Sequence, residues 1–192
     1  MNTLIKNAWI VDGTGKKPFL GSVGIENNTI QFVTAEKITE ENFIQIIDAK
    51  KYFLTPGFID VHSHADYSNF TPGDLCPKIS QGITTEIVGQ CGFSTAPIPK
   101  HNAALWRSIS IIDDHRTIGS WESTQEYFIA LKQKGLESNL MAFVGATTLR
   151  FAVVGNAART LTNLELLQLE KLATESFLAG AAGLSFGLIF DR

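Results

Sequence analysis

The chain has 192 residues, a formal net charge of −3, 44% hydrophobic residues and 18% charged residues. This apolar content is sufficient for a sizeable core and excludes an intrinsically disordered chain. The slight acidity argues against nucleic-acid binding, which needs clustered Lys and Arg. Two cysteines are too few for a disulfide framework and fit a reducing cytoplasm. The sequence shows neither a run of about 20 apolar residues that would span a membrane nor a signal peptide, so we expect a cytoplasmic protein without a membrane partner.

Residues 1–55 have the pattern of a small β-domain. Short apolar runs predict strands at 4–10, 43–47 and 52–54. Val23 and Ile25 lead into Asn27-Asn28, which predicts a hairpin turn because asparagine tolerates the left-handed conformation. Pro56-Gly57 then interrupts the pattern, and we place a domain boundary there.

Residues 56–192 alternate between strand and helix patterns. The predicted strands are 58–61, 83–88, 140–144 and 184–189. Helices are predicted at 72–81 and 101–112, and two more begin at capping boxes, Ser123 with Glu126 and Thr162 with Glu165. Such alternation is typical of βαβ units around a parallel sheet, so the sequence predicts an α/β fold.

Metal-binding residue types follow the first two strands of this second part. His62 and His64 face the same way at the end of a strand, since side chains at i and i+2 share a face. Cys91 follows the next strand, and right-handed crossovers bring the carboxyl ends of parallel strands to one edge. Imidazole and thiolate both bind zinc, so the three residues form a candidate zinc site. The alternatives are that the two histidines are exposed residues of a turn and that Cys91 is a buried structural thiol. We expect Cys76 to be a thiol of the core.

Several motifs in the chain resemble one family. The run 54–64 resembles the first-strand signature of the amidohydrolase superfamily. The run 77–85, followed by the cysteine-containing run 89–92, is similar to the N-acyl-D-amino-acid deacylase, or D-aminoacylase, family. Three further stretches agree with that family, 12–15, 144–150 and 180–188.

The resemblance implies a small β-domain and a zinc-dependent (β/α) barrel that hydrolyses N-acyl-D-amino acids to a carboxylate and a D-amino acid. It assigns His62, His64 and Cys91 as metal ligands and places an acid/base aspartate on the last barrel strand, which this chain lacks. A complete barrel has eight strands and about 250 residues. We therefore expect 1–55 to be the N-terminal part of the small β-domain and 56–192 to be the first four βα units of a TIM-like barrel.

Other polar residues near these strands have candidate roles. Asp66 matches an acidic position of the family and either orients a ligand histidine or is a solvated loop carboxylate. Asp60 is expected to form structural hydrogen bonds on the other face of its strand. Arg150 either binds a substrate carboxylate or forms a structural salt bridge. His101 and His115 are expected to be ordinary exposed residues.

Two positions depart from the family pattern. Phe190 stands where the family often has a substrate-contacting tyrosine, and Ala146 follows Gly145 where histidine is common. These departures are compatible with an alternative, a non-catalytic remnant or interaction module. Its incomplete barrel would self-associate through exposed strand edges and apolar faces. A cyclic amidase of the dihydroorotase or dihydropyrimidinase type shares the paired histidines, but Cys91 favours the deacylase group.

Overall fold

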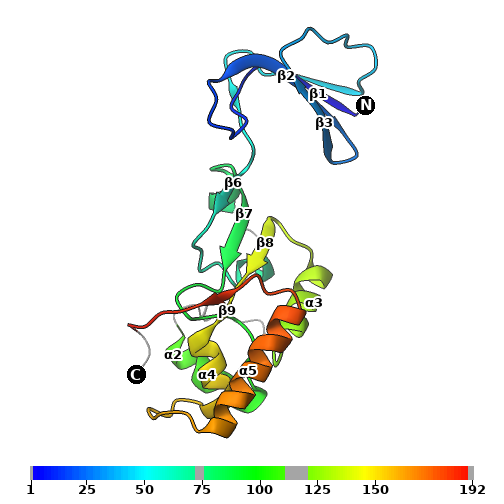
Figure 1. Ribbon diagram of the computed structural model, residues 1–192. Helices are drawn as coiled ribbons and strands as arrows, with labels where there is room; N and C mark the ends of the chain where they lie inside the picture. The colour runs from blue at the N-terminus through cyan, green and yellow to red at the C-terminus, as the bar shows by residue number, and fades with distance from the viewer. Residues whose placement is uncertain (1, 72–75, 111–120, 190–192) are drawn as a thin grey trace. The chain divides into compact units, whose positions relative to one another are not determined.

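The computed structural model describes residues 2–71, 76–110 and 121–189 of the chain. The chain divides into two compact units, Met1–Gly57 and Phe58–Arg192 (Figure 1). His115 and Phe190, which the sequence singled out, lie outside the described residues. Within the described ranges, every helix is too short or too polar to cross a membrane.

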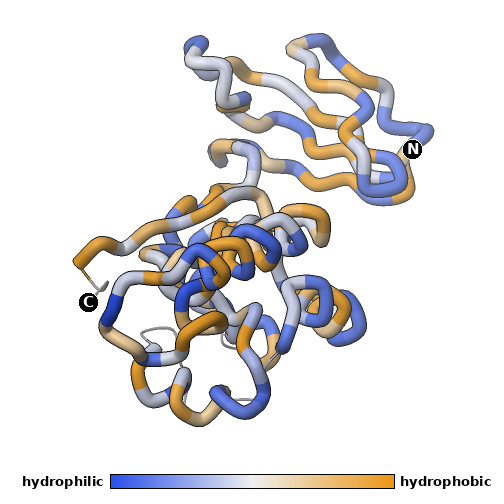
Figure 2. The backbone as a smooth tube through the Cα atoms, turned by 60° about the horizontal axis from the view of Figure 1, so that its bottom comes forward, coloured by the Kyte–Doolittle hydropathy of each residue, from blue (hydrophilic) through white to orange (hydrophobic). Residues whose placement is uncertain are grey.

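The first unit is a five-stranded sheet. Its strands are β1 (Thr3–Ile10), β2 (Phe19–Glu26), β3 (Thr29–Thr34), β4 (Gln45–Asp48) and β5 (Phe53–Leu54). The strand order is β3-β2-β1-β4. Strand β2 pairs antiparallel with both β1 and β3, whereas β4 and β5 both run parallel to β1. Ala8 and Ile10 pack with Val23 in its core, and apolar and polar stretches alternate along these strands in Figure 2. Positive φ angles at Asn27 and Asn28 confirm the predicted hairpin turn.

The second unit contains parallel strands that follow one another in chain order. They are β6 (Phe58–Asp60), β7 (Ile83–Val88), β8 (Asn139–Ala142), β9 (Val144–Gly145) and β10 (Leu184–Ser185). One sheet has the order β6-β7-β8, and β9 pairs with β10. Ala182 donates its amide to the carbonyl of Ala142, so the segment that leads into β10 already lies beside β8. The predicted α/β fold is confirmed, although the fourth predicted strand is only two residues long.

Helices connect the strands of the second unit. They are η1 (Ser68–Phe70), α1 (Cys76–Ile79), η2 (Lys100–Asn102), α2 (Ala103–Ile109), α3 (Thr124–Lys134), α4 (Ala146–Val154) and α5 (Asn163–Leu178). The predicted capping box of α5 is complete, because Thr162 accepts from the amide of Glu165 and the Glu165 carboxylate accepts from the amide of Thr162. The capping box of α3 is only half formed. Ser123 accepts from the amide of Glu126, but the Glu126 carboxylate accepts from the amide of Glu122 instead.

One face of the sheet packs under helices. Val88 and Ala142 share this face and contact Tyr127 and Leu131 of α3 in a buried cluster. Helix α5 lies beside α4 and also contacts α3 (Figure 1). A second buried cluster contains Tyr67, Phe93, Ile98, Ala103, Trp106 and Phe151. The core of this unit is therefore formed on the helical side of the sheet.

The opposite sheet face is open to solvent. Ile59 lies on it, and Ile87 and Met141 face each other on it in the register of β7 and β8. Ile59 is 58% exposed and Met141 is 47% exposed. Val61, two residues beyond Ile59, is 66% exposed. A row of apolar side chains on a strand face is ordinarily buried against another layer, so this face has the character of an interior surface.

Cys76 does not lie where the sequence predicts. It is the first residue of α1 and is exposed, whereas the sequence led us to expect a core thiol. Helix α1 is four residues long and has no buried residue. A single turn of this length presents little surface to a core, which explains why its cysteine stays in contact with solvent.

Candidate metal centre

His62 and His64 follow β6 in a segment fixed by hydrogen bonds. The amide of His62 donates to Asp60 Oδ1 over 3.2 Å, which confirms the structural role expected for Asp60. Ser63, between the histidines, donates its amide to the carbonyl of Ile87 over 3.0 Å. The two imidazole rings are exposed and lie with their centroids 5.5 Å apart. The segment therefore presents both imidazoles at the carboxyl end of the first parallel strand.

Cys91 lies in a tight turn directly after β7, which we call the Cys91 turn (residues 89–92). Three of its residues have positive φ angles, +75° at Gly89, +59° at Cys91 and +83° at Gly92. A β-carbon at Gly89 would meet the carbonyl oxygen of Phe143 at 2.1 Å, so only glycine fits there. Cys91 itself has a β-carbon, and for such a residue the left-handed conformation costs about 1–2 kcal/mol. Other contacts must therefore hold the turn.

The carboxyl ends of β6 and β7 bring the histidines and the cysteine together. His62 Nε2 lies 3.2 Å from Cys91 Sγ. One ligand atom of each of His62, His64 and Cys91 lies within 4.8 Å of the others. Zinc–ligand distances of about 2.0–2.3 Å in a tetrahedron separate the ligand atoms by about 3.4–3.6 Å. The observed spacing thus fits a shared ion after small side-chain rotations, and two imidazoles with one thiol suit zinc.

The protonation of His64 also suits a metal ligand. Desolvation lowers the pKa of His64, and the charges of His62 and Lys78 lower it further. This shift favours the neutral imidazole, and a histidine must be neutral to donate a lone pair to a metal.

Lys78 ties the histidine segment to β7. Its Nζ lies 2.8 Å from Asp60 Oδ2, from Glu86 Oε2 and from Ser63 Oγ. Glu86 is 1% exposed, so Lys78 supplies the cation that this buried carboxylate requires. The hydrogen bond from Lys78 holds the pKa of Asp60 below its usual range. Sequence reasoning missed this cluster because Lys78 is 18 residues from Asp60 and 8 residues from Glu86, spacings that match no local pattern.

Asp66 is buried rather than solvated, which corrects one of the two alternatives drawn from the sequence. It is 1% exposed, and its Oδ1 accepts a hydrogen bond from the amide of Gly89 over 2.9 Å. Tyr127 donates its hydroxyl to the backbone carbonyl of Asp66. Burial raises the pKa of Asp66 to about 7, and the nearby charge of Glu86 adds to that rise. Its hydrogen bond thus reaches the Cys91 turn rather than a histidine ring.

Other predicted positions lie elsewhere. Arg150 in α4 donates hydrogen bonds from Nη2 to the carbonyl oxygens of Ala157 and Arg159, each over 2.6 Å. These partners are backbone groups, whereas the structural alternative drawn from the sequence was a salt bridge. Its proposed role toward a substrate carboxylate stays a prediction. His101 in η2 is exposed, as expected. Ala146 is the first residue of α4 and follows Gly145 of β9.

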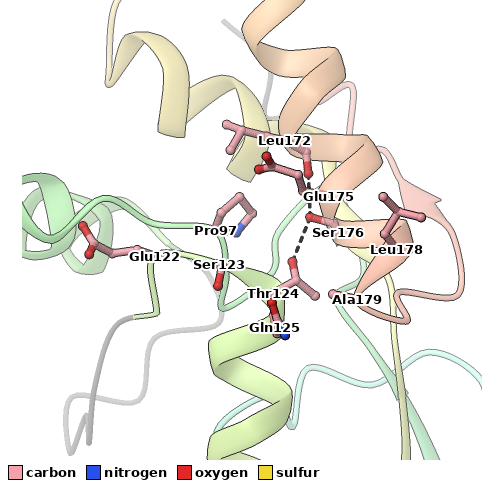
Figure 3. Close-up of a pocket in the computed structure, with 10 residues that line it drawn as sticks. All are labelled: Pro97, Glu122, Ser123, Thr124, Gln125, Leu172, Glu175, Ser176, Leu178 and Ala179. Atoms are coloured by element: carbon pink, nitrogen blue, oxygen red, sulfur yellow. Dashed lines mark hydrogen bonds between the residues drawn. The ribbon is translucent and has the colours of Figure 1, made fainter.

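A cavity of about 370 Å³ lies between the N-terminus of α3 and the C-terminal half of α5 (Figure 3). Ser176 donates a hydrogen bond to the carbonyl of Leu172 and accepts one from Thr124 Oγ1 at this place. The cavity is lined by Pro97, Glu122, Ser123, Thr124, Gln125, Leu172, Glu175, Ser176, Leu178 and Ala179. It shares no residue with the candidate metal site.

Residues 45–159 match the model of the Amidohydrolase family. This chain belongs to the amidohydrolase family. It is 30% identical over 187 residues to N-acyl-D-aspartate deacylase from Alcaligenes xylosoxydans xylosoxydans, an alignment that covers 97% of this chain and 36% of that deacylase.

The crystal structure of N-acyl-D-glutamate deacylase from Bordetella bronchiseptica, complexed with zinc and a phosphonate inhibitor, superposes with a TM-score of 0.85 at 31% identity and covers 97% of this chain. A structure of D-aminoacylase, which has a binuclear metal centre, superposes with a TM-score of 0.84 at 31% identity and covers 96% of this chain. The chain spans 38% of the length of each of these two structures.

Proposed function

We propose that this chain is the N-terminal part of a metal-dependent amidohydrolase that deacylates N-acyl-D-amino acids to a carboxylate and a D-amino acid. The observation that carries the proposal is the meeting of His62, His64 and Cys91 at the carboxyl ends of neighbouring parallel strands. The likeness to deacylases of N-acyl-D-aspartate and N-acyl-D-glutamate supports this substrate class.

We assign His62, His64 and Cys91 as the protein's ligands for zinc. When bound, zinc acts as a Lewis acid and activates water for attack on an amide carbonyl. Cys91 binds as the thiolate and the histidines bind as neutral imidazoles, so metal uptake releases protons from the chain. Asp66 and Lys78 act behind these ligands, because Asp66 accepts from the amide of Gly89 and Lys78 contacts the residues that flank His62.

We further propose that residues 56–192 form the first half of a TIM-like barrel and that 1–55 form the N-terminal part of a small β-domain. Parallel strands in chain order support the half-barrel, as does the open apolar sheet face. In a barrel this face is the interior, filled by layers of side chains. The acid/base aspartate of the reaction would then come from the part of the longer protein that carries the last barrel strands.

The open face also supports a second candidate, an interaction module that self-associates. Ile59, Val61 and Met141 remain substantially exposed, and large exposed apolar patches mark interaction surfaces. Light scattering tests this second candidate. A dimer of the isolated chain that persists at low concentration supports self-association, whereas a strict monomer contradicts it.

The activity is tested with the isolated chain and with the longer protein that contains it. The isolated chain should bind zinc and should release no acetate from N-acetyl-D-amino acids. The longer protein should hydrolyse these D-substrates and leave N-acetyl-L-amino acids and cyclic dihydropyrimidines intact. Hydrolysis of the cyclic amides alone, or no hydrolysis by a zinc-loaded longer protein, would contradict the proposed function.

A further inference from the structure

A single hydroxyl group joins the two ends of the Cys91 turn. Ser185, in β10, is 8% exposed. Its Oγ donates to the carbonyl oxygen of Gly89 over 2.5 Å and accepts from the amide of Gly92 over 3.0 Å. These partners lie 96 and 93 residues away along the chain. One side chain of β10 therefore holds Gly89, before Cys91, and Gly92, after it.

The turn needs such a contact for two reasons. Cys91 adopts a φ of +59°, in the left-handed region that residues with a β-carbon rarely occupy. Gly89 and Gly92 are both buried, so their peptide groups cannot turn to water for hydrogen bonds. Without Ser185, the carbonyl of Gly89 and the amide of Gly92 would each lose the partner found here. Both groups would then favour a backbone rearrangement that restores their hydrogen bonds.

Other contacts also hold the turn. Gly92 accepts at its carbonyl from the amide of Thr148, and Asp66 accepts from the amide of Gly89, and each of these two bonds fixes one end. The amide of Phe93 donates to the carbonyl of Gln90 and closes the backbone around Cys91. The Ser185 hydroxyl adds the described contact that joins Gly89 to Gly92, and it thereby helps to set where the Cβ–Sγ bond of Cys91 points.

We propose that Ser185 is a positioning residue that holds Cys91 where its sulfur reaches His62 and His64. The inference rests on the zinc site proposed above. It predicts that loss of the Ser185 hydroxyl weakens metal binding, whereas an equally small deletion that costs similar stability elsewhere in this unit leaves metal binding unchanged.

The test compares two equally small deletions, Ser185→Ala and Ser176→Ala. Ser176 is 2% exposed and also makes two side-chain hydrogen bonds, but it lies in α5 at the cavity of Figure 3 and contacts no residue of the Cys91 turn among its described bonds. Co²⁺ replaces zinc as the probe, because its bond to a thiolate gives a charge-transfer absorption band that reports on Cys91 directly. Urea unfolding of the metal-free proteins measures the stability lost in each variant.

We expect Ser185→Ala to bind Co²⁺ about tenfold more weakly than the unchanged chain, within the range typical of groups behind a metal ligand. Ser176→Ala should lose similar stability and keep its Co²⁺ affinity. Equal Co²⁺ affinity in Ser185→Ala and the unchanged chain would overturn the role of Ser185 and leave the zinc site standing. Absence of a thiolate band in the unchanged chain would overturn both.

A second measurement needs no variant. The amide of Gly92 donates to Ser185 Oγ, so hydrogen exchange at Gly92 in the unchanged chain should be strongly slowed. Exchange at the rate of an unstructured peptide would show that the bridge is absent in solution, and would overturn the proposal even if Ser185→Ala failed to fold.

Discussion

His62 Nε2 and Cys91 Sγ lie 3.2 Å apart, although 29 residues separate them in the chain. The contact arises because β6 and β7 are neighbouring parallel strands and each residue follows the carboxyl end of its own strand. Glycines then allow the chain after β7 to turn sharply enough to direct the thiol toward the imidazoles.

Replacing Cys91 should remove most of the metal affinity. Cys91→Ser exchanges a thiolate for a hydroxyl that does not ionise at pH 7, so we expect zinc affinity to fall by at least about tenfold. Cys76→Ser is the matched control, since Cys76 is exposed and has no place in the site. Calorimetric titration with zinc measures both. Equal losses in the two variants would count against Cys91 as a ligand.

The lysine behind the histidines should contribute to stability. Lys78→Met leaves the buried carboxylate of Glu86 without a cation, and we expect the free energy of unfolding to drop by about 2 kcal/mol or more. Lys171→Met removes an exposed ion pair with Glu175 at 3.8 Å and should change stability by less than about 0.5 kcal/mol. Urea denaturation measures the two changes, and a similar small loss in both would refute the structural importance of Lys78.

The buried Asp66 should leave a signature in the pH dependence of stability. Its pKa is about 7 in the folded chain and about 4 when unfolded, so the unfolded state loses its proton first as the pH rises. Stability contributed by Asp66 therefore falls between about pH 4 and pH 7 and is constant above that range. Asp66→Asn does not titrate. The stability advantage of the unchanged, metal-free chain over Asp66→Asn should shrink as the pH rises through this window, and an advantage that grows would contradict the assignment.

Gly145 should tolerate no side chain. A β-carbon there would lie 2.2 Å from the carbonyl oxygen of Gly92, so Gly145→Ala must displace the Cys91 turn. We expect a loss of about 1–3 kcal/mol in unfolding free energy together with weaker zinc binding. In Gly183→Ala the new β-carbon would meet only the Phe143 ring, at 3.2 Å, and that ring can shift. Zinc affinity that is unaffected by Gly145→Ala would argue against contact between β9 and the metal site.

Sequence reasoning brought the three candidate ligands together because its logic is topological. Strands after Pro56 alternate with helices, and parallel strands with right-handed crossovers share one edge at their carboxyl ends. That rule alone places His62, His64 and Cys91 together, and the structure has them within 4.8 Å. The hairpin at Asn27 and the α5 cap at Thr162 were equally predictable, because each depends on a few adjacent residues.

The supporting residues could not be found in this way. Ser185 contacts the Cys91 turn across 93 residues, and a single serine in a short strand carries no local signal of that contact. Lys78 and Glu86 look like ordinary charged residues until the fold brings them together beside Asp60. The burial of Asp66 and the exposure of Cys76 are likewise set by which elements pack over them.

X-ray absorption spectroscopy of the zinc-loaded chain tests the proposed metal site most directly. Ligation by Cys91, His62 and His64 predicts one sulfur neighbour at about 2.3 Å, with the remaining neighbours being nitrogen or oxygen at about 2.0–2.1 Å and showing the outer-shell scattering of two imidazoles. The sulfur contribution should disappear in Cys91→Ser and persist in Cys76→Ser. A shell of nitrogen and oxygen neighbours alone in the unchanged chain would contradict the account.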